Sequence, residues 1–169
     1  MNLVALLPLA IAYIQGQTDS TTTDLKDGYS RVTTPNYTVD IPNGWAVSKE
    51  TPWGARSFQP AQGKGELGVM TAPPSSQPWD QLYQTALYFI QREEKGKATP
   101  YRLTKTARGL EAASFEVLDA EGFAARRYVM IKDKAKGLLA LSVKVPSREA
   151  DKQWSKHFER MISSAKFKD

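Results

Sequence analysis

Very short turns separate the strand-like runs in the second half of this chain. These runs cover residues 101–107, 112–118, 123–131 and 138–145. Gly109 and Gly122 stand in two of the turns, where glycine lets a hairpin adopt positive φ. Strands joined by so few residues must run antiparallel, because a parallel pair needs a crossover of about a dozen residues or more. The turns therefore exclude a parallel β–α–β wrap.

The first half of the chain predicts shorter strands of the same kind. They are expected over residues 37–41, 45–47, 56–59 and 66–71. The first alternates apolar and polar residues, which is the period of a half-buried strand. A Pro-Asn-Gly turn over 42–44 ends it, because proline fixes φ and Asn-Gly tolerates positive φ.

Two amphipathic helices complete the predicted elements. The first is expected over 78–94, with an apolar stripe of Trp79, Leu82, Ala86, Phe89 and Ile90. The second is expected over 148–165, with Ser147 as its N-cap and an apolar face of Ala150, Trp154, Phe158, Met161, Ile162 and Ala165. Helices that are apolar on one side need a sheet to cover. The sequence therefore predicts an α+β fold, with one antiparallel β-sheet flanked by helices in an α/β/α sandwich.

The N-terminal residues indicate export. Residues 3–14 are an unbroken apolar run of roughly 18 Å as a helix, well short of a bilayer core of about 30 Å. Such a run at an N-terminus, followed by Ser- and Thr-rich sequence, is typical of a signal peptide. A buried strand or a short uncleaved anchor is the alternative. We expect a signal peptide over 1–16, a polar linker over 17–27 and a single domain over 28–169, with secretion or a periplasmic location and no transmembrane span.

Several segments together resemble the PsbP/Mog1-like family, in its secreted bacterial PsbP-like form. They are YTVDIPNGWAV, SFQP, WDQLYQTALYFIQRE, YRLTKTARGLEAASFEV, RRYVMIKDKAKGLLALSVKVP and WSKHFERMISSAKF. The resemblance covers residues 37–168 and implies an antiparallel sheet between helices. It also implies a non-catalytic binding or assembly module. The photosystem member assists the oxygen-evolving centre and the yeast member binds a small GTPase. Neither role carries over, because residues 17–27 lack histidine and the chain is basic.

Few residues offer catalytic or metal chemistry. The chain has no cysteine and a single histidine, His157, which is expected at the edge of the second helix's apolar face. A G-x-G-x-x-G pattern over 63–68 is followed by Pro73 and Pro74, so no helix can begin there to bind a pyrophosphate. That pattern predicts a hairpin turn. Asp40 is expected to face outward or to cap a turn. We expect no enzyme, no metal and no cofactor.

Charge distribution is the feature that most suggests a partner. The chain carries a net charge of +5, and the excess of Lys and Arg lies in residues 92–169. The candidate partner-binding residues are Lys132, Lys134, Lys136, Arg148, Lys152, Lys156 and Arg160. They suggest an anionic protein or envelope component as partner, the alternative being a helix face that is only solvated. Aromatic residues fall mostly on core stripes, so nucleic acid is not expected.

A second function class remains open from the sequence. The sheet and a helix could enclose a pocket for a small apolar ligand or lipid. The residues expected to line such a pocket are Trp45, Phe58, Tyr83 and Phe89. The chain would then be a carrier rather than a protein-binding module.

Overall fold

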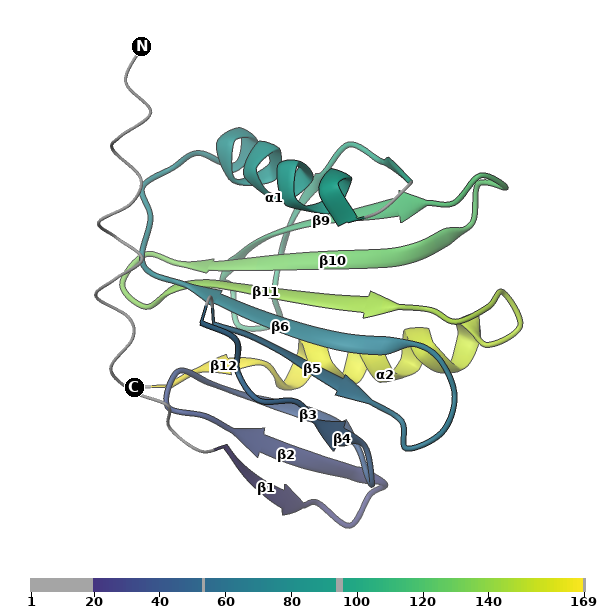
Figure 1. The fold of residues 1–169 in the computed structure, drawn as a ribbon. Helices are drawn as coiled ribbons and strands as arrows, with labels where there is room; N and C mark the ends of the chain where they lie inside the picture. The colour runs from purple at the N-terminus through teal and green to yellow at the C-terminus, as the bar shows by residue number, and fades with distance from the viewer. Residues whose placement is uncertain (1–19, 53, 94–95, 169) are drawn as a thin grey trace.

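Two antiparallel sheets and two helices make up the described part of the chain (Figure 1). The computed structural model describes residues 20–52, 54–93 and 96–168. The expected signal peptide over 1–16 lies outside these residues. The predicted α+β architecture and its antiparallel pairing are confirmed. The expectation of one sheet is wrong, because a second, smaller sheet is present.

The large sheet has the strand order β4-β5-β6-β11-β10-β9-β7, and β8 also pairs with β9. Its strands are β4 Ala46–Val47, β5 Ala55–Gln59, β6 Glu66–Ala72, β7 Lys97–Ala98, β8 Arg102–Lys105, β9 Glu111–Leu118, β10 Ala124–Asp133 and β11 Gly137–Lys144. Every pair is antiparallel, as the short turns predict. The glycine pattern over 63–68 is a turn that leads into β6, as expected.

The small sheet has the order β1-β2-β3-β12. Its strands are β1 Thr21–Asp24, β2 Tyr29–Thr33, β3 Tyr37–Pro42 and β12 Lys166–Phe167. Only β3 was predicted. β1 contradicts the expected polar linker over 17–27. All four residues of this strand pair with β2, and three of them are β-branched threonines. The short β12 lies against β3, so it joins the two ends of the described chain.

The two helices cover opposite faces of the large sheet. α1 spans Trp79–Glu93 and α2 spans Asp151–Ser164, close to the predicted ranges. In Figure 1, α1 lies in front of the upper strands and α2 lies behind β6 and β5. Trp154, Phe158 and Met161 are buried under α2, as its apolar face predicts.

The expectation that Ser147 caps α2 is wrong. Residues 148–150 form a turn in which the Arg148 carbonyl accepts the Asp151 N–H, so the helix begins later than expected. Ala150 occupies the N-cap position without a side-chain hydrogen bond. Ser147 instead hydrogen-bonds Glu149, which lowers the pKa of that carboxyl group. The proline before Ser147 therefore opens a turn and not the helix itself.

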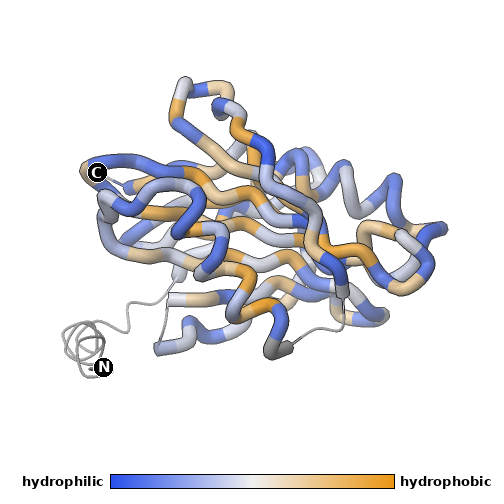
Figure 2. The backbone as a smooth tube through the Cα atoms, turned by 90° about the horizontal axis from the view of Figure 1, so that it is seen from above, coloured by the Kyte–Doolittle hydropathy of each residue, from blue (hydrophilic) through white to orange (hydrophobic). Residues whose placement is uncertain are grey.

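Two apolar clusters fill the spaces on either side of the large sheet. Alternate residues of β11 contribute to the two clusters: Leu139 and Leu141 face α2, whereas Leu138 faces α1. The α2-side cluster also takes in the small sheet, through Val32, Val39 and other buried residues. Figure 2 shows the apolar stretches along the central strands. No helix within the described ranges is long and apolar enough to cross a bilayer.

Candidate functional site

The four residues expected to line an apolar pocket are not brought together. Trp45 and Phe58 belong to the α2-side cluster, and Tyr83 belongs to the α1-side cluster across the sheet. Phe89 is 58% exposed. The inner stripe of α1 consists of buried Leu82 with partly buried Ala86 and Ile90, so Phe89 lies outside it and contacts the ring of Tyr88.

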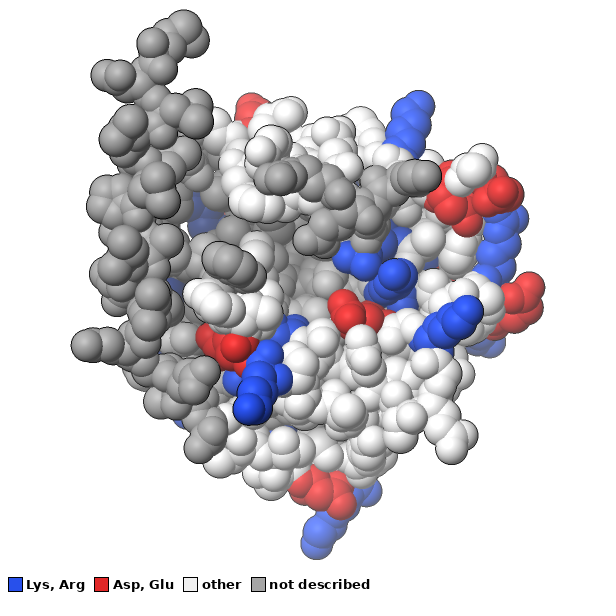
Figure 3. Space-filling model, in the orientation of Figure 1, with Lys and Arg blue, Asp and Glu red and all other residues white. Residues whose placement is uncertain are grey.

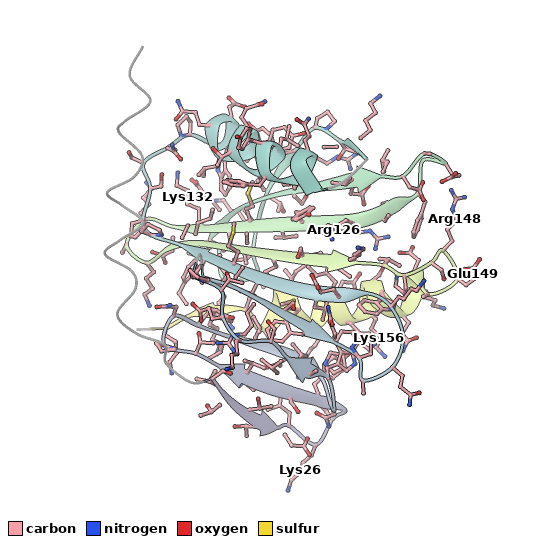
Figure 4. The ribbon with its side chains drawn as sticks, in the orientation of Figure 1. Lys26, Arg126, Lys132, Arg148, Glu149 and Lys156 are labelled. Atoms are coloured by element: carbon pink, nitrogen blue, oxygen red, sulfur yellow. The ribbon has the colours of Figure 1, made fainter. Side chains whose placement is uncertain are left out.

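The seven expected basic residues do not form one surface. Figure 4 places Lys132 at one end of the large sheet and Arg148 near the other. The Lys132 ammonium group donates to the Gln77 carbonyl, and Arg148 donates to the carbonyl of Glu121. Arg160 is engaged in ion pairs with two aspartates. On the face in Figure 3, blue and red side chains are interspersed and form no continuous basic area.

The remaining four basic residues lie on two exposed segments. They are Lys134 and Lys136 in the β10–β11 turn, and Lys152 and Lys156 on α2. The two lysines of α2 stand one helical turn apart, as the sequence spacing predicts. Arg160 lies on the same helix, but Asp27 and Asp40 engage its guanidinium group.

Asp40 is buried, which corrects the expectation that it faces outward. Its carboxylate is 1% exposed and lies between two guanidinium groups. Arg31 Nε donates to one oxygen at 2.8 Å, and Arg160 Nε donates to the other at 3.1 Å. The hydrogen bond to Asp40 raises the pKa of Arg31. Because both oxygens already accept charged donors, this carboxylate is arranged to join β2, β3 and α2 and not to transfer protons.

A second closed polar cluster surrounds Arg56. Its guanidinium group, almost fully buried, donates to the Ser20 hydroxyl and the Ser48 carbonyl and pairs with Glu50. The buried hydroxyl group of Tyr37 lies near it, and burial raises the pKa of Tyr37 to about 12. This cluster connects the start of β1 with the large sheet, and Arg56 Nε has no hydrogen-bond partner among the described residues.

His157 packs against aromatic rings, as its place on the edge of α2 predicts. Its Nδ1 is 3.0 Å from the Tyr29 hydroxyl oxygen, and its ring lies 5.7 Å from that of Trp45. Burial, and secondly the charge of Lys156, lowers the pKa of His157. The ring joins β2 and the start of β4 to α2. Among the described residues, the ionisable group within hydrogen-bond distance of its ring is the Tyr29 hydroxyl.

An apolar groove lies on the α2 side of the molecule. It is bounded by the β8–β9 turn, the C-terminal half of α2 and β12, has a volume of about 240 Å³ and is partly open to solvent. Its floor is formed by Leu110, Ile131, Leu139, Ile162, Ala165 and Phe167. Three charged residues stand at its rim, namely Lys105, Arg108 and Glu159. We refer to this feature as the α2 groove.

None of the sequence-predicted site residues lines the α2 groove. Arg108, predicted only as part of a turn, reaches across the rim, and its Nη1 donates to the Ala165 carbonyl at 3.3 Å. These two residues are 57 positions apart, and no sequence pattern relates them. The α2 groove lies between the large sheet and a helix, where a pocket was predicted. The residues that line it differ from the four that were predicted to do so.

The described residues hold two buried charged clusters and no group arranged for a metal. Within residues 20–52, 54–93 and 96–168, no three His, Cys, Asp or Glu side chains are grouped to hold a metal. The Asp40 carboxylate accepts from two guanidinium groups, and the terminal nitrogens of Arg56 are engaged, while its Nε has no hydrogen-bond partner among these residues. An apolar floor with charged residues at its edge is the arrangement typical of contact surfaces.

Comparison with known proteins supports the fold. No family model matches the sequence, and no curated protein matches it. Among solved structures, the chain is similar to cyanobacterial PsbP (CyanoP) from Synechocystis sp. PCC 6803, determined in solution. The TM-score is 0.57 at 15% sequence identity, covering 91% of this chain and 95% of that one. The fold is PsbP-like. The PsbP part of the sequence resemblance is thus confirmed as a fold, whereas the Mog1 part stays a prediction.

Proposed function

We propose that this chain is a secreted or periplasmic, non-enzymatic binding module that supports the assembly of a protein partner. The observation that carries the proposal is that the buried charged groups which come together in the structure are bound to one another. Both oxygens of Asp40 accept hydrogen bonds from arginines, and both terminal nitrogens of Arg56 are engaged by neighbouring residues. The side chains that remain exposed are therefore available for contact with a partner, and the PsbP-like fold is consistent with an assembly role.

The lysines of α2 supply a contact surface for an anionic partner. Lys152 and Lys156 are both exposed, and neither forms an ion pair with another residue that the structure describes. Exposed charges steer association over distances of about 10 Å at moderate ionic strength. Binding through them therefore weakens with added salt and with a reversal of their charge.

A pull-down from an envelope extract tests this proposal. The variant Lys152→Glu/Lys156→Glu should lose the partner that the wild type retains at low salt. The matched control is Lys49→Glu/Lys64→Glu, which changes the net charge equally at exposed positions outside α2. Recovery that is insensitive to salt, or equal loss in both variants, would contradict the use of this surface.

The α2 groove supports a second candidate function, that of a carrier for a small apolar ligand. Its apolar floor between the sheet and α2 is the supporting observation. Native mass spectrometry of the purified protein, with decanoate as added probe, tests it. A retained or added ligand that shifts the NMR methyl signals of Ile131 and Ile162 would favour the carrier. Unchanged mass and signals would exclude it.

A further inference from the structure

The α2 groove combines a rigid apolar floor with a charged rim. Ile131 and Leu139 are buried residues of β10 and β11, and they form part of the floor. Ile162 and Phe167 add the walls from α2 and β12. Ile131 and Leu139 belong to the main core, and the β8–β9 turn supplies the opposite side of the groove.

The size of the groove favours a side chain of a protein over a small molecule. Pockets for small molecules are commonly about 300–1,000 Å³ and enclose most of the ligand. The α2 groove measures about 240 Å³ and is partly open, so it can enclose one large apolar side chain. Protein interfaces are commonly centred on a single anchor of this kind, packed in a pocket and ringed by polar contacts.

The charge around the groove indicates what flanks that side chain. Lys105 and Arg108 stand on the rim, opposed by Glu159 alone among the lining residues. Two cations against one carboxylate on the rim complement an acidic segment.

We propose that the α2 groove is the docking site for an acidic segment of a protein partner, which inserts one large apolar side chain between the β8–β9 turn and α2. This inference rests on the proposed binding function and names the chemistry of its partner. The apolar side chain fills the space above Ile131 and Leu139, while neighbouring carboxylates face Lys105 and the exposed donors of Arg108.

Selection from a phage library of seven-residue peptides on the wild-type protein tests the inference. Enriched peptides should carry one Phe, Leu or Trp among several Asp or Glu. Fluorescence anisotropy with the enriched peptide should show a loss of about tenfold or more for Ser163→Trp, which fills the groove from an exposed lining position. Lys105→Glu should weaken binding about threefold, as expected for an exposed rim charge.

The matched control is Gln153→Trp, an exposed position of the same helix that does not line the groove. It should bind the peptide as the wild type does. Basic or purely polar enriched peptides, no enrichment at all, or equal binding by Ser163→Trp would overturn the inference. Decanoate shifts at the floor methyl groups without peptide enrichment would overturn it in favour of a carrier.

The two proposals fail in distinguishable ways. If the envelope partner is lost with Lys152→Glu/Lys156→Glu but retained by Ser163→Trp, the binding function stands and the groove inference fails. If both variants retain it, both proposals fail. Loss with both Ser163→Trp and Lys152→Glu/Lys156→Glu, together with retention by Gln153→Trp, supports both proposals.

Discussion

Asp40 offers a stringent test of how the small sheet is held to α2. Its buried carboxylate accepts hydrogen bonds from Arg31 and Arg160, which are 39% and 37% exposed at their side chains. We expect Arg31→Met and Arg160→Met each to lower the free energy of unfolding by about 1 kcal/mol. Each variant loses charge-assisted hydrogen bonds, but the loss is moderated because the guanidinium groups are partly solvated.

The double variant should lower the free energy of unfolding by more than the sum of the two single variants. With both arginines removed, a carboxylate that is 1% exposed has no countercharge. Removing the partner of a buried charge costs about 3–5 kcal/mol. The coupling between the two substitutions should therefore exceed about 1 kcal/mol, since either arginine alone still compensates Asp40.

Urea unfolding followed by tryptophan fluorescence measures these free energies, because Trp154 is a buried residue of α2, the helix that carries Arg160. Adding Asp40→Asn to the double variant should recover part of the loss, since a neutral amide is cheaper to bury than an unpaired carboxylate. Additivity of the two arginine substitutions within about 0.5 kcal/mol would refute the argument that they share one buried charge.

Three further results are expected. Gly65→Ala should lower stability by about 2 kcal/mol in urea unfolding, because φ is +111° and the added Cβ would lie 2.5 Å from the indole of Trp154. Wild-type stability should fall as the pH drops below about 6.5, because a lowered His157 pKa means that the unfolded state binds the proton more readily; His157→Gln should remove this dependence of the urea midpoint. Phe89→Ser should change the free energy of unfolding in urea by less than about 0.5 kcal/mol, since Phe89 is exposed.

Local periodicity explains why most of the large sheet and both helices could be predicted. The positions of Trp154, Phe158 and Met161 are fixed by the helical repeat alone, and the turns at Gly109 and Gly122 dictate antiparallel neighbours. Such signals need only a few adjacent residues. These local patterns predict which helices and strands form and which of their faces are buried.

The small sheet and the α2 groove depend on contacts between distant segments. β12 is two residues long, too short for any periodic pattern, and its pairing with β3 joins positions more than 120 residues apart. Asp40 was predicted to face outward because β2, which carries Arg31, was not foreseen. A hint was present, because Asp40 lies between Val39 and Ile41, and a strand buried on both faces requires a countercharge.

The pairing of β3 with β12 has a consequence for the timing of folding. The Asp40 backbone N–H donates to the Ser164 hydroxyl, 124 positions further along, and β12 follows directly after that residue. During synthesis from the N-terminus, residues 20–42 must therefore wait for residue 167 before their sheet gains its fourth strand. Until then one edge of β3 is unpaired, and Asp40 has Arg31 but not Arg160 as a countercharge.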